Sequence, residues 1–109
     1  SYNKRARSKI EIDDMIEKLY EDLSIKSVMK GNGYAYVNLD RDLSLQEFDS
    51  VMKKYNARKL FESPELGTGV KSKGVVIARS IKISGDFVKD GDNDEYKTRT
   101  LIIERLDKE

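Results

Sequence analysis

The chain has 109 residues, 21 basic and 20 acidic side chains, a formal net charge of +1 at pH 7, and neither cysteine nor histidine. The missing cysteines exclude disulfides, thiolate metal sites and thiol nucleophiles, and the missing histidines exclude imidazole as a general base or metal ligand. A chain of this length is expected to build one hydrophobic core. No apolar run approaches the roughly 18 residues that span a bilayer, so we expect a soluble protein, cytoplasmic or otherwise intracellular, without a membrane partner.

Charge is distributed unevenly along the chain. Acidic residues dominate in 10–56 and 90–109, whereas basic residues dominate in 1–9 and 57–89. The first nine residues contain four basic side chains and no acidic one: Lys4, Arg5, Arg7 and Lys9. This stretch has no hydrophobic period, so we expect residues 1–8 to form a flexible basic arm and residues 9–109 to form a single domain.

A first helix is predicted over about residues 9–30. Ser8 and Glu11 have the spacing of a capping box, in which each side chain satisfies a backbone N–H of the other residue. An apolar stripe at helical spacing then follows: Ile12, Met15, Ile16, Leu19, Tyr20 and Leu23. Ser24 to Lys30 is interpreted as a further helical turn, ended by Gly31. The outer surface of this helix is predicted to be acidic.

The middle of the chain predicts a strand, a second helix and a short strand. Residues 34–39 have the composition of a strand that follows the turn at residues 31–33. Ser44 and Glu47 repeat the capping-box spacing and predict a helix over about residues 45–55. A short strand is expected at 58–62, ended by Ser63-Pro64. Residues 64–73 are predicted to form a loop.

A long antiparallel hairpin is predicted at the carboxyl end, pairing about residues 74–88 with about residues 95–106. A two-residue turn at Gly91-Asp92 places Phe87 opposite Tyr96 and Ile83 opposite Thr100. One face of the hairpin is then mostly apolar. The other face gathers four basic side chains: Lys82, Lys97, Arg99 and Arg105. A four-residue loop, or a bulge near Thr100, would change this pairing.

These elements together predict a small two-layer α+β domain. The expected order is α-β-α-β-β-β. The sheet is expected to be mixed or antiparallel, to be built on the hairpin, and to be covered on one face by the two helices.

No catalytic, cofactor or metal motif is present. Asp90, Asp92 and Asp94 alternate like calcium ligands, but the Gly and the final Glu of that motif are missing. The glycines of residues 67–74 fit neither a dinucleotide-binding loop nor a Walker A loop. We therefore expect no cofactor, no metal and no enzymatic activity. Tyr34 and Tyr36 share one strand face and would stack bases if that face were open, although a covering helix is the commoner outcome.

The sequence leads to three functional hypotheses. The first is a non-enzymatic binding or regulatory module that associates with nucleic acid through eight basic residues: Lys4, Arg5, Arg7, Lys9, Lys82, Lys97, Arg99 and Arg105. The alternative is a protein-interaction or inhibitor domain, which self-associates through the hairpin edge or uses the acidic helix face. The third is a carboxylate-based, metal-dependent enzyme such as a nuclease.

Overall fold

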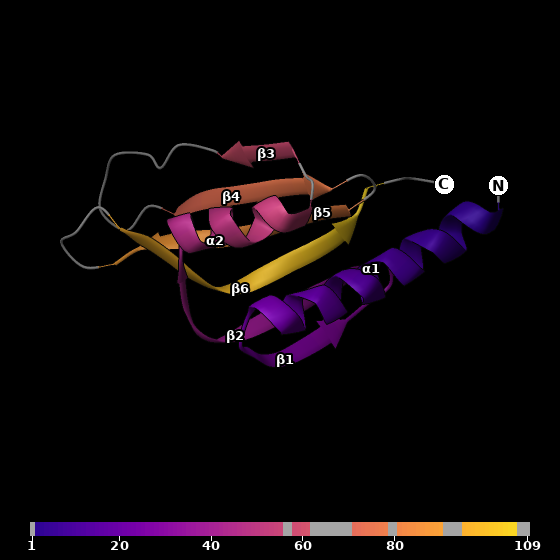
Figure 1. Ribbon diagram of the computed structural model, residues 1–109, viewed down its shortest axis with the longest axis horizontal. Coiled ribbons are helices and arrows are strands. Elements are labelled where there is room, and N and C mark those ends of the chain that lie inside the picture. Colours follow the sequence, from indigo (N-terminus) through magenta and orange to yellow (C-terminus); the bar gives the residue numbers. More distant parts are fainter. Residues whose placement is uncertain (1, 56–57, 62–70, 79–80, 91–94, 107–109) are drawn as a thin grey trace.

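The computed structural model describes the backbone of residues 2–55, 58–61, 71–78, 81–90 and 95–106, and their side chains except at 2–11, 58–61 and 71–72. The elements run in the following order (Figure 1): α1 (Tyr2–Asp22), β1 (Ile25–Lys30), β2 (Tyr34–Ser44), α2 (Leu45–Met52), a 3-10 turn (Lys53–Tyr55), β3 (Arg58–Phe61), β4 (Lys71–Ala78), β5 (Ile81–Lys89) and β6 (Tyr96–Arg105). One six-stranded sheet has the order β1-β2-β6-β5-β4-β3, and every neighbouring pair is antiparallel. The α+β class is confirmed. The predicted order α-β-α-β-β-β is wrong, because the additional strand β1 precedes β2, and β4 and β5 replace one long strand.

The first helix differs from its prediction at both ends. It begins at Tyr2, so the start predicted at about residue 9, with Ser8 as its cap, is wrong. Residues 2–8 contain neither Gly nor Pro, and their Lys, Arg and Ala residues favour the helix. It ends at Asp22, and residues 25–30, predicted as helix, form strand β1.

The β1–β2 turn accounts for this second difference. Gly33 has φ +85°, and the Gly31 N–H donates to the Tyr34 carbonyl at 2.8 Å. A tight turn at Asn32-Gly33 joins two antiparallel strands, so the residues before it are drawn into the sheet.

The second helix follows its prediction. The Glu47 N–H donates to Ser44 Oγ at 3.1 Å, and the Ser44 N–H donates to Glu47 Oε1 at 3.0 Å. This reciprocal pair is the predicted capping box, and it starts α2 at Leu45.

The prediction of the carboxyl-terminal hairpin is wrong in its strand division and register. The predicted strand 74–88 is divided into β4 and β5, which pair with each other. Ile83 lies opposite Ile103 and not Thr100, and Val88 lies opposite Lys97. The pairing changes register between Gly85 and Val88, and the Asp90 N–H donates to the Glu95 carbonyl at 2.9 Å across residues 91–94. The predicted turn at Gly91-Asp92 lies outside the described residues, but the pairing of Val88 with Lys97 does not have the register that this turn requires. The observed register buries Ile83 and Ile103 completely.

Both helices lie on the same face of the sheet, in front of the strands in Figure 1. The core forms between the helices and the sheet, and its buried side chains include Ile16, Leu19, Phe48, Met52, Val37, Ile83, Phe87, Leu101 and Ile103. Phe48 of α2 packs edge-to-face on Phe87 of β5, with ring centroids 5.4 Å apart. The predicted cover of one face by helices is thus confirmed, and no described helix covers the other face, which we call the open face.

Candidate functional site

Large apolar side chains are exposed on the open face. Tyr34 and Tyr36 of β2 alternate with the buried Ala35 and Val37, so they point away from the helices. Met29 lies opposite Tyr36 on β1, and Ile102 lies opposite Tyr36 on β6. Met29 is 62% exposed, Tyr34 40% and Tyr36 38%. These four side chains form an aromatic and apolar patch of a kind that usually marks a binding surface.

The two tyrosines lie against each other. Their ring centroids are 5.6 Å apart, and the ring planes meet at 78° in an edge-to-face arrangement. The Tyr34 ring lies over Gly31, where an added Cβ would stand 2.2 Å from the Tyr34 Cζ. The missing side chain at Gly31 therefore makes room for the Tyr34 ring beside the turn.

A polar row adjoins the patch on the same face. Asn38 Nδ2 donates to Ser27 Oγ at 3.0 Å, and Thr100 Oγ1 donates to Asn38 Oδ1 at 3.1 Å. A shallow groove of about 350 Å³ passes over this row between Lys26 and Arg99. The groove places hydrogen-bonding groups, two cations and the Asp40 carboxylate next to the aromatic patch.

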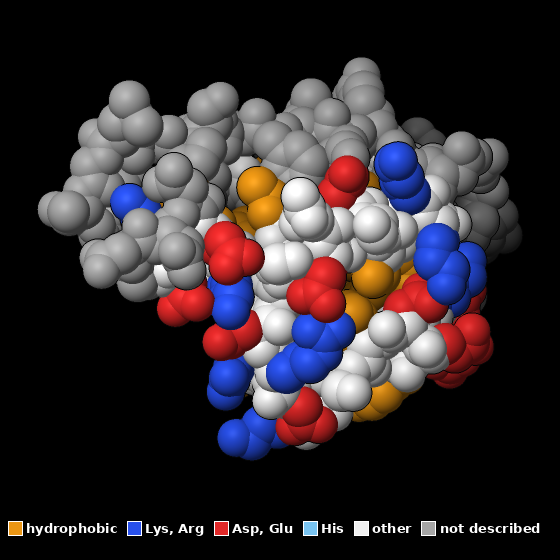
Figure 2. Space-filling model, turned by 60° about the vertical axis from the view of Figure 1, so that its left-hand side comes forward, with side chains coloured by type: hydrophobic (Ala, Val, Ile, Leu, Met, Phe, Trp, Pro, Cys, Tyr) orange, Lys and Arg blue, Asp and Glu red, His pale blue; other side chains and the backbone are white. Residues whose placement is uncertain are grey.

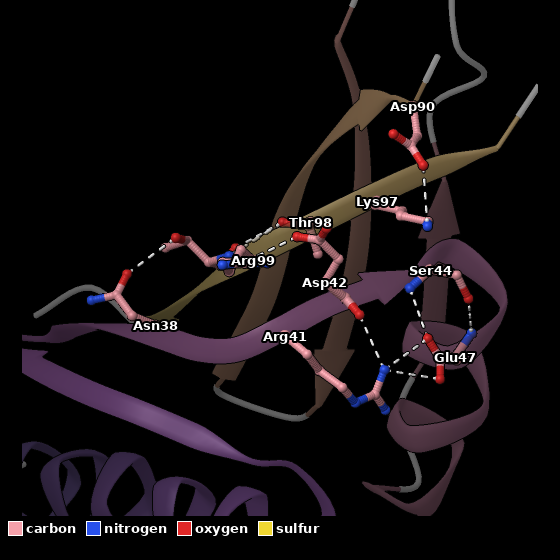
Figure 3. Close-up of polar contacts among 10 residues, drawn as sticks. Asn38, Arg41, Asp42, Ser44, Glu47, Asp90, Lys97, Thr98 and Arg99 are labelled. Carbon is pink, nitrogen blue, oxygen red and sulfur yellow. Dashed lines mark hydrogen bonds and ion pairs between the residues drawn. The ribbon is translucent and has the colours of Figure 1, made fainter. Parts of the chain in front are cut away.

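Three of the four basic residues predicted for the hairpin form ion pairs with carboxylates, and the fourth, Arg105, lies apart from them. Lys82 Nζ lies 3.4 Å from Glu104 Oε2. Figure 3 shows the other two pairs: Lys97 Nζ lies 3.1 Å from Asp90 Oδ2, and Arg99 Nε lies 2.9 Å from Asp42 Oδ1. The hydrogen bond to Asp90 raises the pKa of Lys97.

Arg105 is two residues after the buried Ile103 on β6, so its side chain lies on the same face of the sheet as that of Ile103. It lines a cavity on the helix side of the sheet together with residues of α1, and so it is separated from the other three.

Acidic and basic side chains alternate around the start of α2. Arg41 Nη1 lies 3.1 Å from Glu47 Oε2, next to the Asp42–Arg99 pair (Figure 3). The hydrogen bond from the Ser44 backbone N–H, followed by that from Arg41, lowers the pKa of Glu47. Figure 2, which brings this end of the molecule forward, shows Lys and Arg side chains interleaved with Asp and Glu. Among the residues described at this end of the molecule, the mixed charges form no predominantly basic surface.

The remaining predicted residues lie in the first turns of α1. The backbone of Lys4, Arg5, Arg7 and Lys9 is helical, and their side chains lie outside the described residues. Figure 1 shows these turns extending past the end of the sheet at which the β1–β2 turn lies. Tyr34 follows that turn directly, so the basic segment and the aromatic patch are at the same end of the molecule.

Within the described part of the chain, no group of three or more acidic side chains is placed to hold a metal ion. The sequence did not lead us to Met29 and Ile102 as site residues. The Asn32-Gly33 sequence could have indicated Met29, because a tight turn there implies a strand on each side. The strand before the turn then places a residue opposite Tyr36, and that residue is Met29.

No protein-family model matches the chain, and neither a curated protein nor a solved structure does so. Among the described helices, none is both long and apolar enough to cross a membrane.

Proposed function

We propose that the protein binds single-stranded nucleic acid on the open face of its sheet. The observation that carries the proposal is the exposure of Tyr34 and Tyr36 on a sheet face that no described helix covers. Single-strand binding proteins stack unpaired bases on aromatic side chains of such faces, and each stacked base contributes about 1–3 kcal/mol. Exposed rings on a sheet face suit splayed bases better than a duplex, whose bases are already stacked on one another.

The groups around the tyrosines suit the rest of a nucleotide. Asn38, Ser27 and Thr100 offer amide and hydroxyl groups to base edges or sugars, and Met29 and Ile102 extend the apolar area. The four basic residues of the first α1 turns supply positive charge at the Tyr34 end. Phosphates that approach this charge release counterions, so binding should weaken as salt is raised.

The ion pairs of the basic hairpin residues modify the first hypothesis. Lys82, Lys97 and Arg99 bind phosphate only after leaving Glu104, Asp90 and Asp42. Exposed pairs of this kind contribute little to stability, so their exchange for phosphate is inexpensive. They therefore assist binding, whereas the tyrosines carry it.

The test is binding of fluorescent single-stranded DNA and RNA of mixed sequence at low and moderate salt. We expect Tyr36→Ala to weaken binding about tenfold, which corresponds to the loss of one stacked base. Tyr20→Ala is the matched control, because Tyr20 is 54% exposed on α1 and lies away from the open face. Its binding should equal that of the wild type.

Two results would overturn the proposal. One is the absence of binding at low salt. The other is equal loss of binding in Tyr36→Ala and Tyr20→Ala. Light scattering on the same samples distinguishes nucleic-acid binding from the protein-interaction hypothesis. If the protein is a dimer, if Met29→Lys dissociates that dimer, and if no oligonucleotide binds, the apolar patch serves self-association.

A further inference from the structure

A cavity of about 500 Å³ opens at the end of the sheet, where the β1–β2 turn meets α1. The turn residues 31–33 form one wall, and Ile12 and Asp13 of α1 form another. Tyr34 and Arg105 line the side that belongs to the sheet. Tyr34 therefore belongs both to this cavity and to the aromatic patch.

The charges that line the cavity favour an anion. Lys30 Nζ lies 3.0 Å from Asp13 Oδ1, so this cation and this carboxylate offset each other. Within the described residues, no carboxylate forms an ion pair with Arg105. Two cations thus face one carboxylate, and the excess positive charge is that of the Arg105 guanidinium.

The turn holds Arg105 in place. The Arg105 backbone N–H donates to the Gly33 carbonyl at 2.9 Å. An added Cβ on Gly33 would lie 3.9 Å from the Arg105 Cζ, so the guanidinium lies close beside the turn. A guanidinium positioned in this way presents a planar fork of N–H donors, which matches two oxygens of one phosphate.

We propose that this cavity is an anion subsite that takes one phosphate group of the bound strand, with Arg105 as its cation. This inference rests on the proposed function and extends it to the end of the sheet. A phosphate on Arg105 leaves the attached nucleoside beside the Tyr34 ring, so the strand would pass from the cavity onto the open face. Backbone N–H groups of the turn, other than that of Gly31, which donates to the Tyr34 carbonyl, would complete the contact.

The first test uses inorganic phosphate alone, followed by NMR of the full chain. We expect shifts at the backbone amides of residues 31–34 and at the Arg105 Nε–H, and we expect Arg105→Gln to abolish them. Asp13→Asn should tighten phosphate binding severalfold, because it removes the one described carboxylate of the cavity. Absence of shifts at tens of millimolar phosphate, or weaker binding in Asp13→Asn, would overturn the subsite.

The second test measures oligonucleotide binding against salt concentration. Arg105→Gln should lower the salt slope by about 0.7, the contribution of one phosphate contact in a single strand. Arg105→Lys should keep the slope and lose affinity, because lysine keeps the charge but lacks the fork. Lys18→Gln, an exposed cation on α1, is the control and should behave as the wild type.

The two proposals fail in different ways. Oligonucleotide binding that Arg105→Gln leaves unchanged would refute the subsite and keep the stacking platform. Phosphate-induced shifts without any oligonucleotide binding would refute the proposed function and would show that the cavity takes a free phosphate compound. A melting temperature of Arg105→Gln equal to that of the wild type establishes that the variant is folded.

Discussion

Asp22 joins the end of α1 to the turn that follows α2. Its carboxylate accepts hydrogen bonds from Lys54 and from Tyr55 Oη, the latter at 2.9 Å. The hydrogen bond from Lys54, supported by that from Tyr55, lowers the pKa of Asp22 below its ordinary value. Burial, followed by the contact with Asp22, raises the pKa of Tyr55. One side chain thus links two helical segments that are separated by the β1–β2 hairpin in the sequence.

This contact predicts a loss of stability in acid. Because the pKa of Asp22 is lower in the folded chain, its contribution is complete above the unfolded pKa near 3.8 and is lost as pH falls through the folded pKa. Asp22→Asn should reduce the free energy of unfolding at pH 7 by about 1 kcal/mol, with a smaller difference below pH about 3.

The measurement is urea unfolding at several pH values. Asp14→Asn is the matched control, because Asp14 is an exposed carboxylate on the same helix. The stability of this control should stay close to that of the wild type. An Asp22→Asn penalty that is as large at pH 2 as at pH 7 would show that the carboxylate charge is not the stabilising feature.

At the scale of the element, the cap of α2 should contribute measurably to the free energy of unfolding. Ser44→Ala removes the acceptor for the Glu47 N–H and should lower the free energy of unfolding by about 1 kcal/mol. Ser50→Ala, at an exposed position inside the same helix, should be neutral or slightly stabilising because alanine favours the helix. Thermal unfolding of both variants tests this, and equal stability of the two would contradict the role of the cap.

The elements that the sequence predicted correctly are those with local signals. Helix α2 has its cap at Ser44 and its buried side chains at Phe48 and Met52 within nine residues, so no distant contact was needed to recognise it. Strand β1 was missed because Ile25, Val28 and Met29 also fit helical spacing. The β4–β5 division was missed because residues 79–80 are Arg and Ser, and no Gly, Asn or Pro indicates a turn there.

The candidate site was only partly accessible from the sequence. The spacing of Tyr34 and Tyr36 shows that they share a strand face, but their exposure depends on which face the helices cover. Neutralisation of the basic side chains was equally hidden, because Arg99 pairs with Asp42, 57 residues away in the sequence. Such long-range contacts are set by the order of strands in the sheet, which local patterns do not specify.

At the scale of the whole molecule, the first turns of α1 extend beyond the sheet (Figure 1). Because these turns extend beyond the sheet, removal of residues 1–9 should leave the melting temperature nearly unchanged. The same deletion should lower the salt slope of oligonucleotide binding by up to about 3, because four cations are lost.

Replacing Lys4, Arg5, Arg7 and Lys9 together by glutamine is the control for the deletion, since it keeps the length of the helix and removes only the charge. Both variants should show the same slope. An unchanged slope in either variant would mean that this segment does not contact phosphate.

The central position of β6 has a consequence for how the chain reaches its fold. In the sheet, β6 lies between the β1–β2 hairpin and the β5-β4-β3 strands, although it is the last strand along the chain. Until β6 emerges from the ribosome, these two parts have no shared strand. The pairing of β2 with β6 closes a loop of more than half the chain, and such long loops slow folding. The hairpin that presents Tyr34 and Tyr36 therefore keeps the edge of β2 unpaired until β6 has been synthesised.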